Sequence, residues 1–143
     1  LYNIFIDFPE LSDFIILILN STLTPIFIEL GARTNLGEGA LDFKVYEAME
    51  VLILNPILLV NRINDLKEIN RVFLFREIFS LIIECGFKQD LPLRLQKPNP
   101  LNDRKLLDEI IFDIIGLNSI ERNEVYWSVC ELVQSRLQKA ETS

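Results

Sequence analysis

The pattern of apolar and polar positions divides the chain into two parts, residues 1–60 and residues 61–143. In the first part, residues 2–6 alternate in the manner of a strand. Residues 11–19 follow Pro9 and are apolar nearly all round, which predicts a buried helix. A buried strand is the alternative for this run, because periodicity alone does not separate the two.

A second helix is predicted directly after this run. Small polar residues suited to cap its N-terminus stand there: Asn20, Ser21 and Thr22. Pro25 is tolerated in a first helical turn, and Gly31 is placed to end the helix. Three apolar residues of this helix are expected to face inward: Ile26, Phe27 and Leu30.

Strand-like alternation returns over residues 41–45, where Leu, Phe and Val alternate with Asp and Lys. This predicts a half-buried strand. A short helix is expected over residues 46–51, and Asn55-Pro56 marks the end of the unit.

The second part is predicted to be helical apart from one linker. A long helix is expected from residue 64 or 65 to about residue 85, with Gly86 ending it. Residues 87–101 contain three prolines and are expected to cross a surface as a linker.

Two further helices are predicted after the linker. Asn102 or Asp103 is expected to cap the first, and Gly116 to end it. Asn118 and Glu121 have the spacing of a capping box for the last helix. The expected apolar face of the first is Leu106, Leu107, Ile110, Ile111, Ile114 and Ile115, and that of the last is Val125, Val129, Leu132, Val133 and Leu137.

These elements predict a mainly α fold of the α+β class. It is a helix-rich domain with a small strand element in the N-terminal half and a C-terminal helical bundle. The chain has 143 residues, half of them hydrophobic, which is enough for a real core. It opens on Leu1 without an initiator Met, which suggests a segment of a longer protein.

Charge and cysteine content narrow the function classes. The net charge of −7 argues against strong DNA binding by the isolated chain, since non-specific affinity comes mainly from Lys and Arg. Cys85 and Cys130 have no metal-site spacing and are expected to be buried free thiols in a reducing cytoplasm. The apolar run at residues 14–19 is far shorter than the ~20 residues that span a bilayer, so no membrane partner is expected.

Residues that usually carry catalysis are scarce. There is no histidine, which removes the common general base and histidine metal sites. Carboxylate pairs such as Asp108 with Glu109, and Glu121 with Glu124, are expected to be surface neighbours on solvated helix faces. No catalytic residue, metal site or cofactor site is predicted in this chain.

The loop between the second helix and the strand is the candidate functional site. Residues that bond phosphates and base edges are gathered there, with glycines that permit close backbone approach: Arg33, Thr34, Asn35, Gly37, Gly39 and Lys44. A polar turn that merely joins a helix to a strand is the alternative.

Two stretches resemble the C-terminal region of adenine-specific DNA methyltransferases of bacterial restriction–modification systems. The first is Leu19-Asn20-Ser21 with residues 31–45, which read GARTNLGEGALDFKV. The second is the closing segment, in which residues 107–117 read LDEIIFDIIGL, residues 121–126 read ERNEVY and residues 132–137 read LVQSRL. The resemblance implies the end of a target-recognition domain followed by a helical extension.

The resemblance also implies what this chain lacks. The family's Asn/Asp-Pro-Pro-Tyr/Phe motif is absent, since Asn55-Pro56-Ile57 and Asn99-Pro100-Leu101 match only its first two residues. The glycine-rich turn that binds S-adenosylmethionine is also missing, so that cofactor is implied only for the full-length enzyme. The implied partners are double-stranded DNA, through the full-length protein, and an upstream catalytic domain, in the cytoplasm. The alternative is a helical protein–protein interaction module with no nucleic-acid role.

Overall fold

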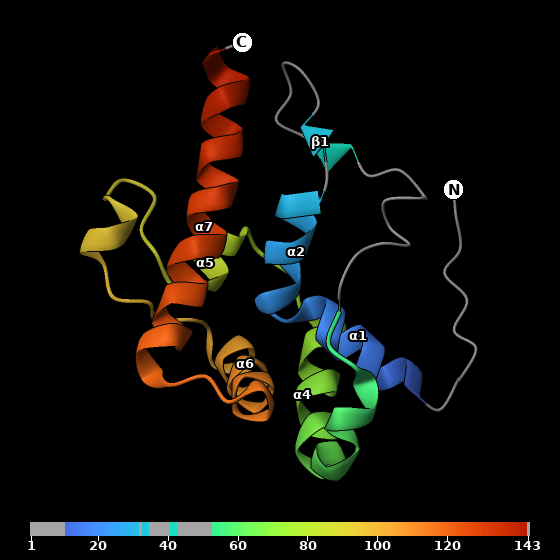
Figure 1. Ribbon diagram of the computed structural model, residues 1–143. Helices are drawn as coiled ribbons and strands as arrows, with labels where there is room; N and C mark the ends of the chain where they lie inside the picture. Colours follow the sequence, from blue (N-terminus) through green and yellow to red (C-terminus); the bar gives the residue numbers. More distant parts are fainter. Residues whose placement is uncertain (1–10, 32, 35–40, 43–52, 143) are drawn as a thin grey trace.

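The computed structural model describes residues 11–31, 33–34, 41–42 and 53–142. These residues form helices and loops, with one pair of two-residue strands (Figure 1). The predicted helix-rich character is therefore confirmed. The strand at residues 2–6 and the helix at residues 46–51 lie outside the described residues, as does the predicted strand beyond Asp42.

The first helices are short and lie where the apolar runs predicted them. Helix α1 spans Ser12–Asn20 and α2 spans Leu23–Gly31. The chain bends between them because Ser21 donates to the Ile18 carbonyl through both its backbone N–H (3.1 Å) and its hydroxyl (2.8 Å). Strands β1 (Arg33–Thr34) and β2 (Leu41–Asp42) follow.

The second part contains the remaining elements. The 3-10 helix η2 (Pro56–Arg62) runs into α4 (Ile63–Phe75), and the one-turn helix α5 spans Leu81–Glu84. After the short 3-10 helix η3 (Leu93–Leu95) come α6 (Asn102–Ile115) and α7 (Ser119–Thr142). In Figure 1, α7 runs alongside α2, and α1 and α4 lie on the opposite side of the molecule.

Two apolar clusters hold these elements together, and α6 contributes to both. The first joins α1, η2, α4 and α6 through Phe14, Leu17, Ile18, Leu59, Leu66, Ile69, Phe73, Leu107, Ile110 and Ile111. The second joins α5 and the following loop to α6 and α7 through Ile82, Cys85, Phe87, Leu93, Phe112, Tyr126, Val129 and Cys130. The first cluster contains residues from both sides of residue 60. Each fully buried Leu, Ile or Phe contributes about 1.5–3 kcal/mol to this packing.

The predicted C-terminal end of α6 and the predicted start of α7 are confirmed. Gly116 has φ of +76° and directs its N–H to the Asp113 carbonyl, as a helix C-cap does. The capping box is complete: Asn118 N–H donates to the Glu121 carboxylate (2.8 Å), and Glu121 N–H donates to Asn118 Oδ1 (3.0 Å).

The long helix predicted from residue 64 or 65 to residue 85 is wrong, because it breaks after Phe75. Arg76 leaves the helix with φ of −115° and ψ of 154°. Its guanidinium turns to the carboxylates of Glu84 and Asp103, and Phe79 N–H donates to Glu84 (2.9 Å). Contacts from distant residues therefore replace the helical hydrogen bonds of this segment.

Other details of the sequence interpretation also need correction. The N-cap of α6 is Leu101, not Asn102 or Asp103, because the Asp103 carboxylate is taken by Arg76. Leu30 was expected to face inward and is 69% exposed. Leu106, Ile115 and Leu137 are also exposed, although they were predicted to lie on the apolar faces of their helices. Residues 87–101 contain no α-helix, but buried Phe87 and Leu93 anchor them to the second cluster.

Among the described residues, no single helix is long and apolar enough to cross a membrane. Helix α1 together with Leu23–Leu30 satisfies the requirement in length and composition, with a bend of 72° between the two helices.

Candidate functional site

The predicted DNA-contacting loop is a hairpin in the part that the structure describes. Arg33 pairs with Asp42 and Thr34 with Leu41 in an antiparallel register. The two strands follow α2 in the chain (Figure 1). Asn35, Gly37, Gly39 and Lys44 lie outside the described residues, and the alternative of a plain polar turn stays open.

A second constellation, not predicted from the sequence, is centred on Asp108 of α6. Asp108 is 0% exposed. Its carboxylate accepts hydrogen bonds from the backbone N–H of Thr22 (2.9 Å), the hydroxyl of Thr22 (2.5 Å) and the phenol of Tyr126 (3.0 Å). One carboxylate thus ties the α1–α2 junction to α6 and α7. The expectation that Asp108 is a surface neighbour of Glu109 is wrong.

Arg104 extends this network one helical turn before Asp108. It is 2% exposed, and its Nε donates to the Glu84 carboxylate at 2.7 Å. Its Nη1 donates to the Asn20 carbonyl (3.0 Å) and to Thr22 Oγ1 (3.1 Å). Because residues four apart share one helix face, Arg104 and Asp108 both contact the α1–α2 junction.

Glu84 is the second buried carboxylate of the network. Besides Arg104, it accepts two hydrogen bonds from Arg76, at 2.7 and 2.8 Å, and one from the Phe79 N–H. Arg76 in turn pairs with Asp103. Two arginines and three carboxylates are therefore joined between α4, α5, α6 and the α1–α2 junction.

The pKa values of the two buried carboxylates, Glu84 and Asp108, are shifted in opposite directions. Burial raises the pKa of Glu84, but the hydrogen bonds from Arg76, Arg104 and Phe79 outweigh it and lower that pKa to about 2. Burial raises the pKa of Asp108 above its usual range, and it outweighs the hydrogen bonds from Thr22 and Tyr126 and the charge of Arg104, which lower that pKa. Burial and the neighbouring Asp108 carboxylate likewise raise the pKa of the Tyr126 phenol.

The network is suited to fastening helices and not to turnover of a substrate. A carboxylate with a raised pKa is a feature of general bases. Asp108 and Glu84, however, are completely enclosed, and protein donors already bond to both. No group of three or more His, Cys, Asp or Glu in the described residues is arranged to hold a metal ion.

The expected buried free thiols are confirmed, and aromatic residues pack between helices close to them. Cys85 and Cys130 are both free and 0% exposed. Phe112 and Tyr126 meet edge to face with ring centroids 5.8 Å apart. Trp127 Nε1 donates to the Gln96 carbonyl at 2.9 Å, which attaches the loop before α6 to α7.

The sequence does contain a signal for the burial of Arg104 and Asp108, which was not predicted. Arg104 and Asp108 lie at helical spacing from the apolar residues Leu107 and Ile111, on the inward face of α6. Charged residues on an apolar face are buried with partners, but the partners Thr22 and Glu84 are distant in sequence and are not indicated by it.

Comparison of the chain with known protein families, with curated proteins and with solved structures gives no match.

Proposed function

We propose that the chain is the non-catalytic C-terminal part of an adenine-specific DNA methyltransferase of a restriction–modification system. It contributes to DNA target recognition and to domain packing. The chemistry, S-adenosylmethionine binding included, belongs to a catalytic domain upstream, into which the target adenine is flipped from the duplex.

The observation that carries this proposal is the meeting of the two stretches that resemble the family. Asn20 belongs to the first stretch, and its carbonyl accepts a hydrogen bond from Arg104. Asp108 and Tyr126 belong to the second; Tyr126 donates to Asp108, and Asp108 accepts from Thr22, two residues after Asn20. Asn20 of the first stretch and Asp108 of the second therefore belong to one buried network, and Thr22 and Arg104, which lie just outside the quoted stretches, link them. This supports a single inherited unit over two chance likenesses.

A second contact supports a scaffolding role for the helical extension. Arg136, in the closing stretch of α7, forms an ion pair with Glu29 of α2 at 3.0 Å. Helix α2 leads directly into β1, so its attachment to α7 fixes where the hairpin begins. In this account Arg33, Asn35 and Lys44 contact DNA, and the helices hold the hairpin in register with the rest of the enzyme.

The test uses the complete protein encoded by the reading frame that contains these residues. The variant combines Arg33→Ala with Lys44→Ala, and the charge-matched control combines Lys67→Ala with Arg71→Ala. Lys67 and Arg71 are exposed on α4, and this helix lies at the opposite end of the molecule from β1 (Figure 1).

Loss of the hairpin cations is expected to weaken binding of the cognate duplex at least about tenfold, since a lost base or phosphate contact costs about 1–3 kcal/mol. The control should bind almost as the parent does. Equal affinities for the two double variants, or a complete protein that transfers no methyl group to DNA, would refute the proposal.

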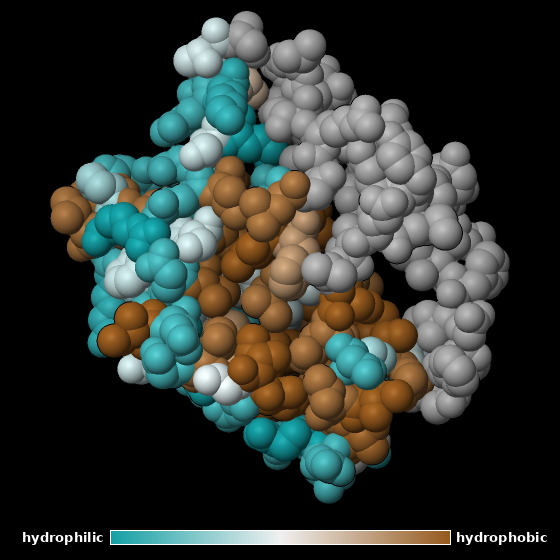
Figure 2. All heavy atoms as spheres, viewed as in Figure 1, coloured by the Kyte–Doolittle hydropathy of each residue, from teal (hydrophilic) through white to brown (hydrophobic). Residues whose placement is uncertain are grey.

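A protein–protein interaction module is the second candidate, favoured by exposed apolar side chains. Figure 2 shows apolar residues gathered over α1, η2 and α4. Of the residues in these elements, Ile57 and Leu58 are exposed on η2, and Phe75 at the end of α4 is 88% exposed. In this case Leu58→Asp and Phe75→Asp would abolish binding of the partner protein, and the Arg33 and Lys44 substitutions would leave that binding unchanged.

A further inference from the structure

A cavity of about 290 Å³ lies between α6, the start of α7 and the segment Pro98-Asn99-Pro100. It does not include the described residues of the hairpin, and it adjoins the buried network around Asp108 through Tyr126. Its volume is at the small end of ligand sites in proteins, which measure about 300–1,000 Å³. The edges of Phe112 and Tyr126 line it from within.

Cationic side chains dominate the charge of this cavity. Lys97, Lys105 and Arg122 line it, against the single carboxylate of Glu109. This excess of positive charge stands out in a chain whose net charge is −7. Lys105 and Glu109 are 3.9 Å apart, a loose pair between exposed side chains that is worth little. The lysines therefore keep most of their attraction for an anion.

Arg122 is held in place at the cavity and retains donor capacity. Its Nε donates to the Leu117 carbonyl (2.8 Å) and its Nη2 to Asp113 (2.6 Å), with the guanidinium over the Phe112 ring. Within the described residues, these hydrogen bonds leave Nη1 without a partner. A guanidinium fixed in this way presents its remaining donors in a defined direction, which favours phosphate recognition.

Neutral donors complete the wall. Asn99, Ser119 and Asn123 line the cavity, and no hydrogen bond within the described residues engages their side chains. Ser119 and Asn123 lie in the first turns of α7, whose positive dipole end adds to the field of the three cations.

Hydrogen bonds within the chain hold the segments that form the wall. Asn99 N–H donates to the Cys85 carbonyl (3.1 Å), and Leu101 N–H donates to the Glu84 carbonyl (3.0 Å). The capping box of Asn118 and Glu121 fixes the start of α7. A preformed site avoids the entropic cost of ordering its loops on binding.

We infer that this cavity binds a phosphate group, with Lys97, Lys105 and Arg122 as the charged ligands and Asn99, Ser119 and Asn123 as neutral donors. The phosphate comes either from a nucleic-acid backbone or from a free nucleotide, since both present the same anionic oxygens. The inference goes beyond the proposed function, because it concerns a different face of the chain and requires no methyl transfer.

The test is a titration of the chain followed by amide NMR signals. The probes are inorganic phosphate, adenosine 5′-monophosphate and a short DNA duplex, with sodium chloride at matched ionic strength as the blank. Signals of Ser119, Asn123 and the Asn99 side chain are expected to shift with the phosphate-bearing probes and not with the blank. A duplex that acts at lower concentration than the nucleotide identifies the nucleic-acid backbone as the source, and the reverse order identifies a free nucleotide.

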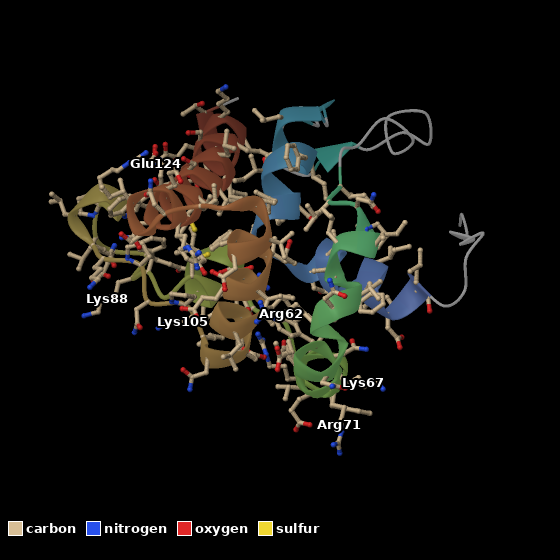
Figure 3. All side chains as sticks on the ribbon, turned by 60° about the horizontal axis from the view of Figure 1, so that its bottom comes forward. Arg62, Lys67, Arg71, Lys88, Lys105 and Glu124 are labelled. Carbon is tan, nitrogen blue, oxygen red and sulfur yellow. The ribbon has the colours of Figure 1, made fainter. Side chains whose placement is uncertain are left out.

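Charge-matched variants complete the test. Lys97→Gln combined with Lys105→Gln removes two exposed cations of the cavity and should weaken the interaction at least about tenfold, which corresponds to about 1.4 kcal/mol. Lys67→Gln combined with Arg71→Gln removes two cations of α4, which lie far from Lys105 in Figure 3, and should have no effect. Shifts that sodium chloride reproduces, no shift with any probe, or equal losses in both variants would overturn the inference. None of these readouts depends on methyltransferase activity.

Discussion

Thr22 gives both its backbone N–H and its hydroxyl to the carboxylate of Asp108, at 2.9 and 2.5 Å, across 86 positions of sequence. The contact is enclosed, since Thr22 and Asp108 are both 0% exposed. Breaking such a contact leaves buried donors without an acceptor, which costs more than the hydrogen bonds themselves contribute. The junction of α1 and α2 therefore depends on α6 for its position.

Asp108→Ala is expected to lower the free energy of unfolding by about 3 kcal/mol or more. The substitution leaves the Thr22 N–H, the Thr22 hydroxyl and the Tyr126 phenol without their acceptor in an enclosed site. Glu109→Ala is the matched control, because it removes the next carboxylate of α6 from a partly exposed position and should cost within about 0.5 kcal/mol. Urea denaturation followed by circular dichroism measures both. Similar midpoints for the two variants would show that the network does not stabilise the fold.

Glu84 makes stability depend on pH in a defined direction. Its pKa is lowered from 4.5 to about 2 in the folded protein. A carboxylate with a lowered folded pKa stabilises the protein above its unfolded pKa and loses that contribution as pH falls toward the folded value. The free energy of unfolding should therefore fall between pH about 4.5 and about 2, in part because of Glu84.

Glu84→Gln isolates this contribution. The variant lacks the titrating group, so the difference in unfolding free energy between the parent and the variant should narrow as pH falls through this window. Asp108 has a raised pKa and acts in the opposite sense, but it is present in both proteins and cancels in the difference. Leu107→Ala is the control: it also destabilises a buried site, by about 2–5 kcal/mol, and its difference from the parent should not change with pH. A difference in unfolding free energy between the parent and Glu84→Gln that stays constant with pH would contradict the lowered pKa of Glu84.

Two glycines with the same backbone conformation should differ sharply in their tolerance of a side chain. Gly86 and Gly116 have φ of +78° and +76°. An added Cβ at Gly86 would lie 1.8 Å from the Asn99 carbonyl oxygen, whereas nothing lies within 4 Å at Gly116. Gly116→Ala should cost only the left-handed strain of about 1–2 kcal/mol, and Gly86→Ala should cost clearly more. Thermal denaturation of both variants measures this, and equal losses would show that Asn99 does not approach Gly86 closely.

Local sequence was sufficient for the features that depend on neighbouring residues. The C-terminal end of α6 follows from Gly116, and the start of α7 follows from the pair Asn118 and Glu121. The conformation of Gly116 and the hydrogen bonds of the pair are set within one helical turn. Amphipathic spacing likewise placed Ile110 and Val129 in the core. Asn20, Ser21 and Thr22 were expected to cap α2, whereas the Ser21 hydroxyl donates to the Ile18 carbonyl in the turn before it.

Features that depend on contacts between distant residues could not be predicted from the local sequence. The break after Phe75 depends on Arg76 reaching Glu84 and Asp103, which an apolar pattern does not indicate. Burial of Asp108 depends on Thr22, far away in the chain. Of the candidate DNA site, the structure places only Arg33 and Thr34, on one strand of a hairpin.

The two cysteines should be unreactive in the folded protein. Cys85 and Cys130 are both enclosed, and the hydrogen bond to Cys130 together with burial raises the pKa of the Cys85 thiol. Since the thiolate is the nucleophile, iodoacetamide should modify neither residue in native buffer and both in urea, as counted by intact mass. Rapid native labelling at either position would contradict the packing of α5 against α7.

The most direct test of the central claim is the nucleotide sequence of the reading frame upstream of the codon for Leu1. If the chain is the C-terminal part of an adenine-specific methyltransferase, that frame encodes a glycine-rich donor-binding turn and an Asn-Pro-Pro-Tyr-like motif. A start codon directly before Leu1, or an upstream stretch with neither motif, would contradict the methyltransferase account and leave the helical interaction module as the explanation of this chain.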